Sequence, residues 1–141
     1  SMVERYRDGV IPAGAATDLD HRIADAVVRY RTAMDANLLH QGAAIALELA
    51  DEGNGFIEER APWKQAREPE QAEALDETLA SLCRSVVAIA SLLSPFMPRK
   101  MADLFGRFGF DRPPEIGTLA ELDLAGRTVN RGDVLFPKDA S

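Results

Sequence analysis

Apolar residues recur every three or four positions along much of this chain, which is the spacing of one face of an α-helix. The most regular stretch predicts a helix over residues 73–94. Its apolar positions alternate in steps of four and three: Leu75, Leu79, Leu82, Val86, Ile89 and Leu93. Such a stripe is typical of a helix in an antiparallel bundle, and we expect it to be buried throughout.

Two more long helices are predicted upstream. Thr17 or Asp18 can cap the first, and Asn37 is expected to end it and to cap the second. The apolar stripe of the first helix is Leu19, Ile23, Ala26, Val27, Tyr30 and Met34. The second covers about residues 38–59, with a stripe of Leu38, Gly42, Ile45, Leu49 and Phe56. Small residues beside that stripe permit close contact between helices.

Glycine and proline mark the remaining boundaries. Residues 1–8 are interpreted as the last turns of a helix, stopped by Gly9, so the chain is expected to start inside a longer protein or behind a cloning remnant. Connectors are predicted at residues 10–16 and 61–72, and a short helix at 99–108. The fold class is therefore predicted to be all-α: an antiparallel bundle of four to five helices at 1–109, with a tail at 110–141. One short helical stretch is expected near 118–123, followed by an extended end.

Composition narrows the functional classes. The chain has 141 residues, enough for one domain, and no apolar run approaches the roughly 18 residues of a membrane span. One cysteine and two histidines argue against a disulfide framework and a metal site. We expect a cytoplasmic protein that does not contact a membrane. The net charge of −7 argues against broad nucleic-acid binding, but it allows a small, locally basic site.

Trp63 is the only tryptophan, and it follows Pro62 where a helix gives way to a connector. In one interpretation it seals the end of the bundle. In the other it is an exposed ring on which a nucleobase stacks, with positive charge supplied by Arg60, Lys64 and Arg67. The residues alone leave both interpretations open.

Four segments of the chain stand out as motifs: RYRDG (Arg5–Gly9), NGFIEERAPWKQA (from Asn54), SPFMP (Ser94–Pro98) and LFPK (Leu135–Lys138). In this order they resemble motifs of the methionyl-tRNA synthetase family, in its C-terminal anticodon-binding domain. The resemblance covers nearly the whole chain, and the LFPK segment favours the methionine enzyme over related class I synthetases.

The resemblance implies an anticodon-binding site. Trp63 would be the stacking platform, Pro62 would set its position, Asn54 would lie on the helix that leads to it, and Arg5 would contact a phosphate or a base. The expected partners are a methionine-accepting tRNA, bound through its anticodon loop, and the catalytic domain of the same enzyme. We expect Leu135, Phe136 and Pro137 to pack against the bundle or to project toward that domain.

The HIGH-like and KMSKS-like signatures and the zinc knuckle of the family are absent from this sequence. The chain is therefore expected to be inactive alone, with no catalytic or metal-binding residue. ATP, and zinc as an open option, are expected only in a catalytic domain outside it. The runner-up functions are a non-catalytic helical protein-interaction module and the equivalent domain of another class I synthetase. An independent enzyme has almost no support, because Glu58–Glu59, Cys83, His21 and His40 lack catalytic or ligand partners.

Overall fold

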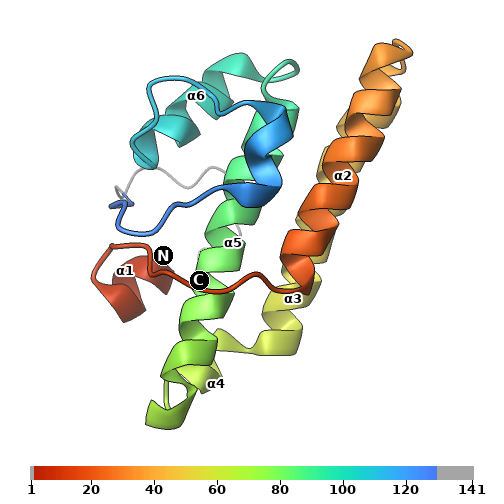
Figure 1. The fold of residues 1–141 in the computed structure, drawn as a ribbon. Helices are drawn as coiled ribbons and strands as arrows, with labels where there is room; N and C mark the ends of the chain where they lie inside the picture. Colours follow the sequence, from red (N-terminus) through yellow and green to blue (C-terminus); the bar gives the residue numbers. More distant parts are fainter. Residues whose placement is uncertain (1, 130–141) are drawn as a thin grey trace.

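The structure is a computed structural model that describes residues 2–129, and it confirms an all-α bundle (Figure 1). Apart from one isolated bridge, the regular elements of these residues are all helical. The α-helices are α1 (Met2–Arg7), α2 (Asp18–Asp35), α3 (Leu39–Arg60), α4 (Pro62–Gln65), α5 (Ala72–Leu93) and α6 (Pro98–Arg107). Two 3-10 helices are η1 (Pro69–Gln71) and η2 (Ile116–Glu121).

Helix α5 is the centre of the fold. Helices α2 and α3 pack against it as a hairpin, while α6 and η2 contact it elsewhere along its length (Figure 1). Because neighbours surround α5, burial extends well beyond the predicted apolar stripe and includes Thr78, Ser81 and Ser85. Every member of the stripe is buried except Val86, which is half-buried. The stripe therefore identified the helix but not its central position.

The predicted close contact between α2 and α3 is present. A Cβ built on Gly42 would lie 2.6 Å from the sulfur of Met34, so only glycine fits without displacing that side chain. At the hairpin tip Asn37 has a left-handed backbone (φ 61°) and follows the end of α2, as expected. Its predicted role as cap of α3 is wrong, because Leu38 is the N-cap and makes no side-chain capping bond. In that position Leu38 is 44% exposed.

A buried polar cluster fixes the connector that leads into α2. Thr17 forms a capping box with Asp20, which confirms Thr17 as the cap. Asp20 accepts hydrogen bonds from Arg84 Nε at 2.6 Å and from Ser81 Oγ at 2.7 Å, both on α5. Burial alone would raise the pKa of Asp20, but the bonds from Arg84, Ser81 and the Thr17 backbone outweigh it and lower the pKa. The connector is thereby joined to the central helix.

The two ends of the described chain meet. After α1, Asp8 and Gly9 both have positive φ, and the Gly9 N–H donates to the carbonyl of Val3 at 3.1 Å, so the predicted stop at Gly9 is present. Val10 forms an antiparallel bridge with Thr128, which places the segment after η2 beside the start of the chain (Figure 1). The prediction for Leu135, Phe136 and Pro137 lies outside the described residues.

Candidate nucleic-acid interface

Trp63 projects from a sharp turn between α3 and α5 that the sequence predicted only as a connector. Ala61 is both the C-cap of α3 and the N-cap of α4, with a left-handed backbone at φ 46° and ψ 66°. Its N–H donates to the carbonyl of Ile57 at 2.8 Å, and its own carbonyl accepts from the Lys64 N–H at 2.8 Å. Pro62 suits the first helical position because its ring fixes φ there and it has no N–H to satisfy.

Pro62 and Trp63 are adjacent in the chain but differ in burial. Pro62 is buried, whereas Trp63 is 40% exposed. A side chain exposed to this extent fits both interpretations, a ring that seals the end of the bundle and a ring on which a base stacks. An accessible ring face is the structural requirement for stacking a nucleobase.

The positive charge predicted around Trp63 is only partly available. Lys64 and Arg67 are exposed, and neither forms an ion pair within residues 2–129. Arg60 is engaged: its guanidinium carbon lies 5.2 Å from the centroid of the Phe56 ring, and its Nη1 lies 3.8 Å from Glu77 Oε1. Of the three predicted cations, only Lys64 and Arg67 are therefore exposed and without an ion pair in the described part of the chain.

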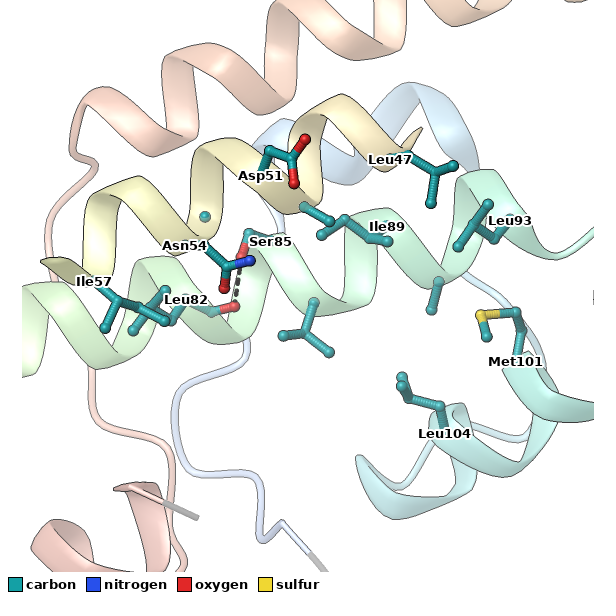
Figure 2. A pocket seen from close by; sticks show the side chains of 14 residues that line it. Leu47, Asp51, Asn54, Ile57, Leu82, Ser85, Ile89, Leu93, Met101 and Leu104 are labelled. Atoms are coloured by element: carbon teal, nitrogen blue, oxygen red, sulfur yellow. Dashed lines mark hydrogen bonds between the residues drawn. The ribbon is translucent and has the colours of Figure 1, made fainter. Parts of the chain in front are cut away.

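Asn54 lies in a groove that Trp63 does not line. The groove runs between α3 and α5, is bordered by α6, and has a volume of about 770 Å³ (Figure 2). Asp51 is the only charged residue among those described that line it, and Asn54 and Ser85 add polar groups. The apolar lining residues named in Figure 2 are Leu47, Ile57, Leu82, Ile89, Leu93, Met101 and Leu104. Asn54 and Trp63 therefore do not share one cavity, although both belong to the α3–α4 segment.

Arg5 is exposed on α1, and its neighbour Arg7 attaches that helix to the bundle. Arg7 Nε donates to Asp76 Oδ1 at 2.6 Å and its Nη2 donates to the Ala72 carbonyl at 3.3 Å, both at the start of α5. The roles predicted for Trp63, Pro62, Asn54 and Arg5 remain predictions. Nothing in the local sequence pattern distinguished Arg7 from Arg5, because the ion pair spans 69 residues.

The described residues were also compared with the requirements of a metal site, a reactive cysteine and a membrane span. They contain no group of three or more His, Cys, Asp or Glu side chains that could hold a metal ion. Burial raises the pKa of the Cys83 thiol to about 12, with Arg84 opposing the shift, so Cys83 is not poised as a nucleophile. Within the same residues no helix is both long and apolar enough to cross a bilayer.

Both the family model and the curated relatives that match this chain are those of methionine–tRNA ligase. The family model described as the anticodon binding domain of methionyl tRNA ligase matches residues 8–140. The chain is 30% identical over 151 residues to methionine–tRNA ligase of Lactiplantibacillus plantarum, covering 98% of this chain and 22% of that protein. It is 31% identical over 156 residues to the ligase of Streptomyces coelicolor, covering 98% of this chain and 29% of that protein.

A solved structure shares the fold. Mycobacterium tuberculosis methionyl-tRNA synthetase in its free state matches with a TM-score of 0.83 and 21% identity, covering 97% of this chain and 29% of that chain. The chain thus spans between a fifth and a third of the length of these proteins.

Proposed function

This chain belongs to the family of anticodon-binding domains of methionyl tRNA ligase, and from that premise we propose that it binds the anticodon loop of a methionine-accepting tRNA. The observation that carries the proposal is Trp63, an exposed ring on a turn whose backbone is fixed on both sides. Unstacked bases in single-stranded RNA loops are bound by stacking on such rings.

In the proposed complex one base of the loop stacks on Trp63, and Lys64 and Arg67 meet the neighbouring phosphates. Pro62 holds the turn, Asn54 offers its amide to a base edge from α3, and Arg5 contacts a phosphate or base from α1. The net charge of −7 is consistent with RNA contact over only a small part of the surface, because an acidic protein repels a polyanion over most of its surface. Two phosphate contacts would give a shallow dependence on salt, with a slope of about −1.4 in log K against log salt.

The full-length protein that contains this domain would ligate methionine to its tRNA with ATP in the cytoplasm. That chemistry would belong to a catalytic domain of the same enzyme, which would also hold any zinc. The present chain would fix the anticodon at a set distance from the reaction and would be inactive alone.

Affinity for a synthetic RNA hairpin that carries the methionine anticodon tests the proposal. Trp63→Ala should weaken binding by about 5- to 150-fold, which corresponds to the roughly 1–3 kcal/mol of one stacked base. Trp63→Phe should recover part of the loss, since it keeps a smaller ring. Val28→Ala is the matched control, because Val28 is an exposed apolar side chain on α2. Wild-type affinity in Trp63→Ala would contradict the proposed role.

The apolar groove between α3 and α5 favours one alternative, a helical protein-interaction module. A module of that kind would not bind the anticodon hairpin in a salt-sensitive way. The hairpin titration, repeated at two salt concentrations, therefore separates the two functions.

A further inference from the structure

The turn that carries Trp63 is tied to two consecutive residues of α5. On the upstream side, Arg60 Nη1 lies 3.8 Å from Glu77 Oε1. On the downstream side, Thr78 Oγ1 lies 2.9 Å from Gln65 Oε1. The four residues between Arg60 and Gln65 are those that reverse the chain and present the tryptophan. Both ties therefore act on the orientation of α4 relative to the bundle.

The bond between Thr78 and Gln65 is the more unusual of the two. Thr78 is fully buried (0% exposed), and its Oγ1 also lies 2.9 Å from the carbonyl oxygen of Ala74 in the preceding turn. Ala74 alone would satisfy a threonine hydroxyl inside a helix. Both contacts are made at once when Thr78 donates to Ala74 and the Gln65 amide turns its NH₂ group toward Thr78. The bond to Gln65 thus links α4 to the core through the Thr78 hydroxyl, which already has a hydrogen-bond partner within α5.

We propose that Thr78 and Gln65 are positioning residues that hold the Trp63 ring ready for a base, an inference that rests on the proposed anticodon binding. Helix α4 has only four residues, too few to keep its orientation without tertiary support. If the bond between Thr78 and Gln65 is lost, the turn samples further orientations. The apparent affinity for RNA then falls in proportion to the fraction of molecules whose Trp63 ring is still in the binding orientation. Trp63 makes the base contact, and the pair acts only through it.

Thr78→Val is the first test, because it removes the hydroxyl but keeps the shape and β-branching of the side chain. Affinity for the anticodon hairpin should fall by about three- to tenfold, the range expected for one hydrogen bond. Trp63 is the sole tryptophan, so its fluorescence anisotropy reports the motion of the turn directly. In the RNA-free, fully folded Thr78→Val protein the anisotropy should fall and acrylamide quenching should rise. Thr78→Ser should restore both readouts.

Gln65→Met removes the same bond from its half-buried end and keeps the test valid if the core variant folds poorly. The double variant should lose no more affinity than either single variant, because both break one bond. Ser91→Ala is the matched control, since it deletes a buried α5 hydroxyl whose sole partner among the described residues is the Val87 carbonyl at 2.9 Å. It should leave anisotropy and affinity unchanged.

Two results would overturn the inference: unchanged Trp63 anisotropy and hairpin affinity in both Thr78→Val and Gln65→Met, or losses of affinity that add in the double variant. If Trp63→Ala still loses affinity in either case, the proposed function stands without this positioning pair. If Trp63→Ala binds like the wild type, anticodon binding through the ring fails, and the positioning role fails with it.

Discussion

Helix α5 holds two connections of the chain in place, and it does so in different ways. At the connector before α2, Asp20 is 5% exposed and is paired with Arg84, Ser81 and the Thr17 N–H. At the turn before α5, single contacts to Glu77 and Thr78 hold a segment whose largest side chain stays exposed. The first arrangement uses its polar groups for internal bonds, whereas the second leaves Trp63 40% exposed. Stability and recognition should therefore respond to different substitutions.

The largest expected effect is on stability, from Asp20→Ala. It leaves the part-buried Arg84 guanidinium, whose side chain is 11% exposed, without its carboxylate, so the cost should approach the roughly 3–5 kcal/mol of breaking a buried pair. Urea unfolding followed by circular dichroism measures the loss. Affinity for the anticodon hairpin, corrected for the folded fraction, should not change. A loss below about 1 kcal/mol would contradict the structural role of the cluster.

Acid should weaken the same cluster. Because the pKa of Asp20 is lowered in the folded protein, its contribution is fully present above the unfolded value of about 3.9 and is lost as the pH falls through the lower folded value. The free energy of unfolding should therefore fall steeply below about pH 4. In Asp20→Asn the same titration should be flatter, and equal acid sensitivity in both proteins would contradict this assignment.

A smaller loss should follow Gly14→Ala in the connector. A Cβ at that position would lie 2.7 Å from the Asp76 carbonyl oxygen and 2.8 Å from Glu77 Cα, so the connector must move away from α5. Overpacking of this kind costs about 1–3 kcal/mol. Gly55→Ala in α3 is the matched control, because its Cβ would meet nothing within 4 Å. That change should stabilise by up to about 1 kcal/mol through helix propensity. Equal effects at the two glycines would contradict the close approach.

The smallest expected effect concerns Cys83, next to Arg84 in α5. Since burial raises the pKa of its thiol to about 12, a thiol reagent at pH 8 should leave the folded protein unmodified. Asp20→Ala should speed the labelling, because weakening the cluster favours opening of the bundle. Mass spectrometry after timed quenching measures both rates. Rapid labelling of the wild-type protein would show that α5 is less protected than described.

Helices that pack an apolar face against the core could be predicted from the sequence, because apolar residues on one face of a helix recur every three or four positions. Helices α2, α3 and α5 were found in this way, and α6 was found from the prolines and glycine around it, all within a residue or two. The four-residue α4 was missed, because it is too short for periodicity and because the reversal at Ala61 needs a left-handed backbone that alanine does not signal. The cap assigned to Asn37 failed because Leu38 takes that place.

The candidate site was predictable only in part. Trp63 was identified from its sequence context, whereas Asn54 was placed on the helix that leads to Trp63 but not in the groove that it lines. The ion pair of Arg60 with α5 spans 17 residues and the hydrogen bond of Gln65 with α5 spans 13, while the pair of Asp20 and Arg84 spans 64. No local sequence pattern predicts pairs so far apart in the chain, because only tertiary packing brings their residues together.

Titration of the Trp63 fluorescence with RNA tests the central claim most directly, because no other tryptophan contributes to the signal. A base stacked on the ring should quench it, so the hairpin with the methionine anticodon should give saturable quenching. A hairpin with the same stem and a different loop should give little or none. If the anticodon hairpin binds, as measured independently by calorimetry, and leaves the Trp63 emission unchanged, the tryptophan is not the platform on which the anticodon is read.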